Sequence, residues 1–176
     1  MKGLKLGLAL VTAGLLAGCA SDGNVSNKSY LRAAVIGSDS VTMSFFSGED
    51  EVMTVSADSP EEALSAAELR GGKKIFTGFT ELVLLDGCDC TDTLERMLRE
   101  WKVAPSCIVA CPRGNGAEFL TSRTAEELEG AVRVAQEQEL IGRCDIVNVL
   151  GELLGSGSAE IPELSRDGFV GKKSIK

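Results

Sequence analysis

The chain has 176 residues, with 26 Asp or Glu against 18 Lys or Arg, so its formal net charge is −8. A surface this acidic disfavours DNA and RNA as partners, because nucleic-acid binding depends on Lys and Arg contacts to phosphate. The sequence contains no histidine, which excludes Ser-His-Asp and Cys-His catalysis and histidine-ligated zinc. Because 44% of the residues are hydrophobic, we expect a globular chain rather than a disordered one.

The N-terminal residues follow the order of a bacterial lipoprotein signal peptide. Lys2 and Lys5 form a short positive segment, and residues 6–15 are apolar but too few to cross a bilayer. The sequence Leu-Ala-Gly-Cys at 16–19 then has the form of a lipobox. An ordinary signal peptide followed by an incidental cysteine is the alternative.

The lipobox predicts cleavage after Gly18, which removes residues 1–18 as a signal peptide. The thiol of Cys19 would then carry a diacylglyceryl group, and acyl chains such as palmitate would hold the protein on the outer face of a membrane. Loss of Lys2 and Lys5 would change the net charge from −8 to −10. The polar residues 19–29 are expected to form a flexible tether between the lipid and the domain.

The first part of the domain is predicted to be a β-meander. Residues 31–36, 41–46 and 51–56 read as three short strands separated by turn residues. Ser59 and Pro60 then predict a helix start, with Glu62 completing a capping box and Gly71-Gly72 ending the helix. Its expected apolar stripe includes Ala63, Leu64, Ala67 and Leu69.

The rest of the chain alternates apolar strands with amphipathic helices. Strands are expected at 80–85 and 106–111, with one more near Phe169 and a hinge-like loop at 155–158. Helices are expected to be capped by Asp92, Thr124 and Asp145, with a short helix at 117–120. Leu154 is expected on the buried side of the helix that Asp145 caps. The predicted fold class is α+β (mixed α/β): an N-terminal β-meander plus helices packed on a mixed sheet, in a single domain.

Five cysteines remain when Cys19 is assigned to the anchor: Cys88, Cys90, Cys107, Cys111 and Cys144. Their spacing, C-x-C and C-x3-C, is not that of the usual paired C-x2-C zinc knuckles. On a strand, residues 107 and 111 would lie about 13 Å apart, too far to form a disulfide or share a metal. We therefore expect Cys107 and Cys111 to be small core residues of a buried strand.

Other segments with polar or aromatic residues favour structural roles. Residues 113–116 lack the pattern and the lysine of a phosphate-binding loop. Trp101 ends an apolar stripe and is expected in the core. Acidic residues in first helical turns favour the helix dipole, and the acids around the C-x-C segment have no cation-binding pattern. The acidic residues in question are Asp86, Asp89, Asp92, Glu126, Glu127 and Glu129. No catalytic, cofactor or metal residue is predicted.

The order of several segments resembles one known family. The quoted features are the lipobox, Val35-Ile36-Gly37-Ser38-Asp39, residues 41–46, residues 56–64, residues 73–85, Glu160-Ile161-Pro162-Glu163-Leu164 and Asp167-Gly168-Phe169-Val170-Gly171. Together they resemble the N-terminal domain of the Ger(x)C family, the lipoprotein C subunit of spore germinant receptors. The likeness covers residues 31–172 and is strongest over 56–85. Ala20-Ser21 stands where the family commonly has Trp-Asp, and Phe79 replaces a common histidine.

The resemblance implies a non-enzymatic accessory subunit that acts in spore germination. It would sit on the outer leaflet of the spore inner membrane, beside a membrane-embedded A-type subunit and a transporter-like B-type subunit. The family-like domain would span 30–158. Residues 159–176 would be an extension where a second family domain begins.

Two other functions stay open. One is an unrelated envelope lipoprotein that binds a ligand, or a metal on Cys88, Cys90 and Cys144. The other is an envelope thiol oxidoreductase, which would require a cysteine with a depressed pKa.

Overall fold

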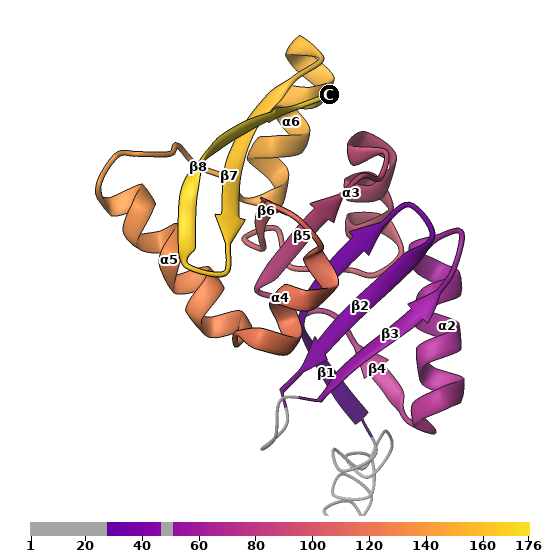
Figure 1. The fold of residues 1–176 in the computed structure, drawn as a ribbon. Coiled ribbons are helices and arrows are strands. Elements are labelled where there is room, and N and C mark those ends of the chain that lie inside the picture. The colour runs from indigo at the N-terminus through magenta and orange to yellow at the C-terminus, as the bar shows by residue number, and fades with distance from the viewer. Residues whose placement is uncertain (1–27, 47–50) are drawn as a thin grey trace, which may run out of the picture.

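The computed structural model describes residues 28–46 and 51–176, which form one mixed sheet covered by helices (Figure 1). The strands are β1 (Lys28–Gly37), β2 (Ser40–Phe45), β3 (Val52–Ser56), β4 (Lys74–Phe76), β5 (Leu82–Asp86), β6 (Ile108–Pro112), β7 (Ala159–Ser165) and β8 (Gly168–Ile175). The helices within the described residues are α2 (Pro60–Gly71), α3 (Cys90–Arg99), α4 (Gly116–Ser122), α5 (Ala125–Glu137) and α6 (Ile146–Ser156). The predicted fold class, α+β with a mixed sheet in a single domain, is confirmed.

The predicted meander is the antiparallel half of the sheet. β2 pairs antiparallel with both β1 and β3. Every residue of β2 after Ser40 is buried, including Thr42 and Ser44. Both faces of β2 are covered, whereas many antiparallel sheets expose one polar face to solvent. The Thr42 hydroxyl meets the Thr54 hydroxyl at 2.9 Å, which satisfies the buried oxygen.

The other half of the sheet is built from parallel strands. The order is β3-β2-β1-β5-β6-β7-β8, with β4 beside the first residues of β1. β1, β5, β6 and β7 run parallel. Their apolar side chains are buried on both faces, as expected for strands joined by helical crossovers. The carboxyl ends of β1 and β5 meet where Gly37 pairs with Asp86.

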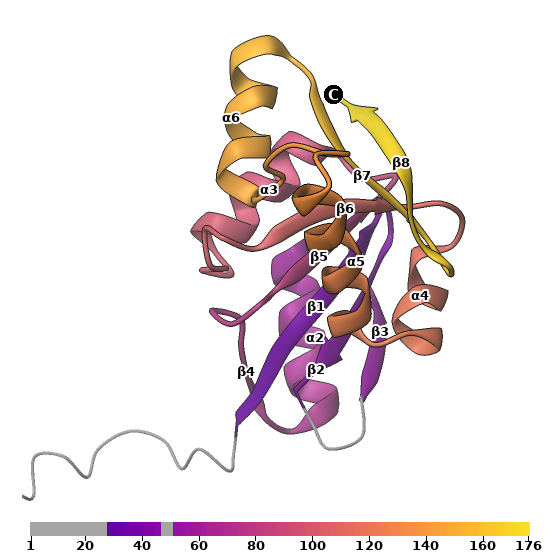
Figure 2. The same cartoon turned by 90° about the vertical axis from the view of Figure 1, so that its left-hand side faces the viewer.

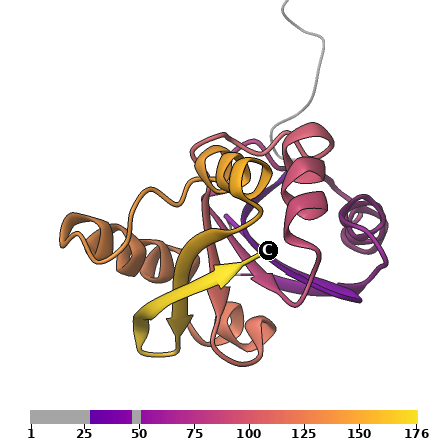
Figure 3. The same ribbon diagram turned by 90° about the horizontal axis from the view of Figure 1, so that it is seen from above.

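Helices cover both faces of the sheet. α2, α3 and α6 form one layer, with α3 between the other two, and α4 lies across the opposite face (Figures 1 and 3). α5 packs against β8 (Figure 2). β1 begins at the end of the molecule opposite the C-terminus (Figures 1 and 2). We call these two ends the amino edge, where β1 and β5 begin, and the carboxyl edge, where they end.

Three local predictions about helices were wrong. α3 is capped by Asp89, whose side chain accepts from the Asp92 N–H, so the helix begins before Asp92. Leu69 and Leu154 are 86% and 63% exposed, because each lies off the stripe that its helix buries. α6 includes Gly155 and Ser156, the first half of the expected hinge-like loop, and is capped by Gly157, which adopts a left-handed φ of 75°.

The C-terminal segment is more regular than expected. One strand was predicted near Phe169, but residues 159–175 form the β7–β8 hairpin. β7 also pairs parallel with β6, so residues 159–165 belong to the same sheet as the strands before position 158. The short strand β4 was not predicted either. It has only three residues, and its pairing with β1 is set by a partner distant in sequence.

Candidate functional site

Four aromatic side chains gather at the amino edge. Tyr30 lies in β1 and Phe46 directly follows β2, while Phe76 ends β4 and Phe79 lies in the turn before β5. These four residues are called the aromatic face. They come from four separate segments that only the sheet brings together.

The rings of Tyr30, Phe76 and Phe79 contact one another, and Phe46 lies beside them across the Tyr30 backbone, to which its N–H donates at 2.9 Å. The ring centroids of Tyr30 and Phe79 are 6.1 Å apart and stacked, and Phe76 meets Tyr30 at 5.8 Å and Phe79 at 5.1 Å edge-to-face. Phe79 is 60% exposed, and Phe46 and Phe76 are 42% and 41% exposed. A Cβ on residue 78 would lie 2.8 Å from the Phe76 ring, so only glycine at this position leaves room for the ring of Phe76 against the turn before β5.

Arg32 joins the aromatic face to its acidic surroundings. Its guanidinium lies 5.0 Å from the Phe46 ring centroid and forms ion pairs with Glu81 at 2.9 Å and Glu126 at 3.1 Å. Burial tends to lower the pKa of Arg32, but the two carboxylates outweigh it and the pKa is raised. The side chain is fixed by three partners and positions Phe46.

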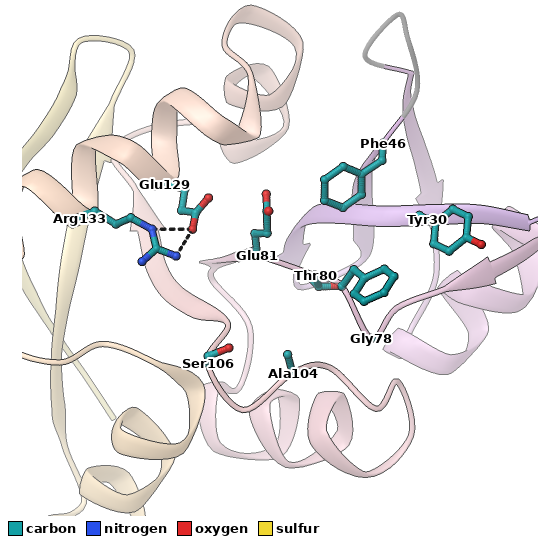
Figure 4. Close-up of a pocket in the computed structure, with 10 residues that line it drawn as sticks. Tyr30, Phe46, Gly78, Thr80, Glu81, Ala104, Ser106, Glu129 and Arg133 are labelled. Carbon is teal, nitrogen blue, oxygen red and sulfur yellow. Dashed lines mark hydrogen bonds and ion pairs between the residues drawn. The ribbon is translucent and has the colours of Figure 1, made fainter.

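A cavity of about 480 Å³ opens beside the aromatic face. Figure 4 shows Tyr30 and Phe46 on one side of this cavity, the Glu129–Arg133 pair on the other and Glu81 between them. Glu129 is only 8% exposed and is held by the Nε of Arg133 at 2.8 Å. The cavity therefore combines an apolar wall with fixed carboxylates.

Lysines lie next to the aromatic face. Lys28 pairs with Lys74 in the β1–β4 register, and Lys73 precedes β4. All three are exposed, and Lys74 forms an ion pair with Glu68 at 2.5 Å. No sequence pattern predicted a basic and aromatic cluster, because these residues are spread over more than forty positions.

The C-x-C segment lies at the carboxyl edge. Cys88 follows Gly87, whose φ of 78° lets the chain turn from β5 into α3, and Cys90 is the first residue of that helix. Both thiols are free. The S–H of Cys90 donates to the backbone oxygen of Cys88 at 3.7 Å. The neighbouring Cys90 thiol also outweighs burial and lowers the pKa of Cys88 to about 7. The same contact and burial raise the pKa of Cys90.

The acidic residues around the C-x-C segment have structural partners. Asp89 caps α3, Asp92 pairs with Arg96 at 2.7 Å, and Asp86 accepts from the backbone N–H of Gly116 at 2.9 Å. Among residues 28–46 and 51–176, no group of three or more Cys, Asp or Glu is arranged to hold a metal ion.

The other three cysteines are core residues. Cys107 and Cys111 are each 1% exposed, which confirms their predicted role in the core, and Cys144 is fully buried. Burial raises the pKa of Cys111 and that of Cys144 to about 11. Cys144 lies beside the start of β6, where its C=O accepts from Val109, whereas Cys88 and Cys90 lie at the carboxyl edge. The three-cysteine metal site considered from sequence is not assembled.

The remaining segments have structural roles. In residues 113–116, Asn115 caps α4 and Arg113 pairs with Glu163 at 2.5 Å. Trp101 is 1% exposed, as predicted. The glutamates of α5 are engaged: Glu126 pairs with Arg32, and Glu127 completes the capping box of Thr124.

Cys19 and the predicted cleavage site lie outside the described residues, as does most of the predicted tether. Among the described helices, none combines the length and apolar character needed to cross a bilayer.

The sequence matches no protein-family model, and neither a curated protein nor a solved structure matches it significantly. The resemblance to the Ger(x)C family therefore stays a prediction.

Proposed function

We propose that this protein is a lipid-anchored, non-enzymatic accessory subunit of a spore germinant receptor. It acts in germination on the outer leaflet of the spore inner membrane, together with the A-type and B-type membrane subunits. The observation that carries this proposal is the exposed aromatic face at the amino edge, where β1 continues from the tether.

The short tether keeps this edge close to the membrane. Nine residues, from the lipidated Cys19 to residue 27, precede Lys28 and can span at most about 30 Å. Because β1 begins at the amino edge, this edge is the part of the domain nearest the anchor, and the carboxyl edge lies at the far end. Confinement by the lipid raises the effective concentration of the domain for membrane-embedded partners.

The chemistry of the aromatic face suits a protein partner. Tyr and Phe rings are enriched in the buried centres of protein interfaces, and Arg is enriched among the residues that contribute most binding energy. Three partly exposed Phe side chains in one patch are unusual on a surface with no partner. The mature chain would carry a net charge of −10, which anionic lipid headgroups repel despite the three lysines beside the aromatic face. A membrane-embedded protein subunit is therefore a better occupant than the bilayer itself.

Affinity purification from detergent-solubilised spore inner membrane tests the proposal. The tagged wild type is expected to recover a polytopic receptor subunit, and a Cys19→Ala variant is expected to recover much less. Recovery of the lipoprotein alone, or its absence from spores, would favour a stand-alone envelope lipoprotein whose cavity binds a small ligand.

A further inference from the structure

Cys88 and Cys90 form a pair of neighbouring free thiols with contrasting surroundings. Cys88 is partly exposed and lines a cavity of about 280 Å³ at the carboxyl edge. Cys90 is 9% exposed, and its Sγ lies 3.7 Å from the backbone oxygen of Cys88. A reagent in solution can therefore reach the thiol of Cys88, while the thiol of Cys90 is buried next to it.

The surroundings of Cys88 favour its thiolate. The neighbouring Cys90 thiol lowers the pKa of Cys88 most, the Thr93 hydroxyl and the backbone N–H groups of Cys88 and Asp86 lower it further, and together they outweigh burial. A pKa of about 7 favours the thiolate of Cys88 near neutral pH, and the thiolate is the reactive form. Burial raises the pKa of Cys111 and of Cys144 to about 11, which keeps these two thiols protonated at pH 7. The charged and titratable groups around Cys88 are Asp58 before α2, Asp86 at the end of β5, and Asp89, Cys90, Asp92 and Arg96 around α3.

We propose that Cys88 and Cys90 are a redox-active dithiol that reacts with disulfides of small thiols or of other proteins. The Cys88 thiolate attacks one sulfur of the incoming disulfide, forms a mixed disulfide and releases one thiolate. Cys90 then loses its proton to that thiolate and attacks the Cys88 sulfur, which forms the Cys88–Cys90 disulfide and releases the second thiolate. Two electrons pass from the protein dithiol to the incoming disulfide, which is reduced to two thiols.

The resulting disulfide would be labile. Only Asp89 separates the two cysteines, and the side chain of Asp89 caps α3. Closing so small a ring at a helix start strains the bond and disturbs the cap, and strained disulfides are the readily reduced, regulatory ones. The pair lies at the carboxyl edge, away from the aromatic face, so a redox partner could reach it while the amino edge faces the membrane.

Thiol mapping of the detergent-solubilised lipoprotein tests this inference, with oxidised glutathione as the probe. Trypsin releases Cys88 and Cys90 together in residues 75–96, Cys107 and Cys111 together in residues 103–113, and Cys144 separately. Oxidised glutathione is expected to remove two hydrogens from the 75–96 peptide and to leave the other peptides unchanged. Alkylation by iodoacetamide at pH 7 is expected to be at least about tenfold faster at Cys88 than at Cys111 or Cys144, with a midpoint near pH 7.

Two variants separate the roles of the two thiols. Cys90→Ser should trap glutathione on Cys88 as a stable mixed disulfide, because no second thiol is left to complete the exchange. Cys88→Ser should leave Cys90 unmodified, because Cys90 is only 9% exposed and its burial raises the pKa of its thiol. The fluorescence of Trp101, the single tryptophan of the chain, checks that both variants are folded.

Three results would overturn the inference. One is a Cys88 alkylation rate no higher than that of Cys144. Another is a wild-type protein that stays glutathionylated on Cys88, since Cys90 would then not complete the exchange. The third is a bond between Cys90 and Cys111, which would join the 75–96 and 103–113 peptides. Each readout is independent of whether the protein binds a germinant receptor.

Discussion

The Oδ2 atom of Asp86 accepts a hydrogen bond from the backbone N–H of Gly116 at 2.9 Å, which joins the end of β5 to the start of α4. The chain approaches so closely here that a side chain on Gly116 has no room. An added Cβ would lie 2.5 Å from Val35 Cγ1 and 2.9 Å from the Asp86 carboxylate. The carboxyl edge is therefore tightly packed at this point, although Gly114 beside it has open space.

Gly116→Ala is expected to lower the free energy of unfolding by about 1–3 kcal/mol, because the overpacked Cβ must displace β1 or Asp86. Urea denaturation followed by Trp101 fluorescence measures the change, with the lipid left out by Cys19→Ala. Gly151→Ala in α6 is the control, since its Cβ would meet nothing within 4 Å. The control should gain about 0.5–1 kcal/mol, as alanine does over glycine inside a helix. Equal effects of both substitutions would contradict the close approach at Gly116.

Asp145 caps α6, and its removal should give a pH-dependent loss of stability. Burial tends to raise the pKa of Asp145, but hydrogen bonds from Asn148 and the charge of Arg143 lower it below its usual value. A carboxylate with a lowered pKa in the folded state contributes stability above its unfolded pKa, and this is lost as the pH falls through the folded value. Asp145→Ala should therefore cost about 1 kcal/mol at pH 7, and the difference from wild type should shrink below about pH 4. Urea titrations at pH 7, 5 and 3 measure the difference in unfolding free energy between wild type and Asp145→Ala. A difference that stays constant down to pH 3 would contradict the role assigned to the Asp145 carboxylate.

Arg32 is expected to stabilise the amino edge through its two ion pairs and the Phe46 ring. Its side chain is only 16% exposed, so these contacts are screened less than surface pairs. Arg32→Ala should lower the free energy of unfolding by about 1–2 kcal/mol, and part of this should persist in 1 M salt. Lys172→Ala is the matched control, because Lys172 and Glu160 are 45% and 65% exposed and 3.7 Å apart. Its effect should stay within about 0.5 kcal/mol.

Local sequence signals predicted much of this fold, and long-range pairing accounts for what they missed. The caps at Ser59, Thr124 and Asp145 depend on residues three positions away and were predicted correctly. Asp89 and Asp92 can both cap a helix, and the turn at Gly87 decides between them. That turn depends on where β5 ends, which the sheet determines.

The two candidate sites also differ in how far local sequence predicts them. The C-x-C segment is visible in the sequence, but the surroundings that lower the pKa of Cys88 depend on how β5 enters α3. The aromatic face is not visible, because Phe46, Phe76 and Phe79 meet Tyr30 only after four segments pair. The burial of Cys107 and Cys111 was predictable because a continuous apolar run is a strong signal for an inner strand.

Phe79 provides the direct test of the aromatic face. It is 60% exposed and contributes two ring contacts, so Phe79→Ser should change the free energy of unfolding by less than about 1.5 kcal/mol. If the face docks on a membrane-embedded receptor subunit, the variant should recover at least about tenfold less of that subunit, a loss of about 1.4 kcal/mol in binding. Leu154→Ser is the matched control, because Leu154 is 63% exposed on α6, away from the aromatic face. It should recover as much as wild type.

Vesicles distinguish a protein partner from the bilayer. The Cys19→Ala protein, which lacks the lipid, should not bind vesicles made of phosphatidylcholine and phosphatidylglycerol, because the strongly negative net charge of the chain opposes anionic headgroups. Binding to these vesicles that Phe79→Ser abolishes would instead assign the face to the lipid surface. Equal recovery of the receptor subunit by Phe79→Ser and Leu154→Ser would show that the subunit docks elsewhere on the domain.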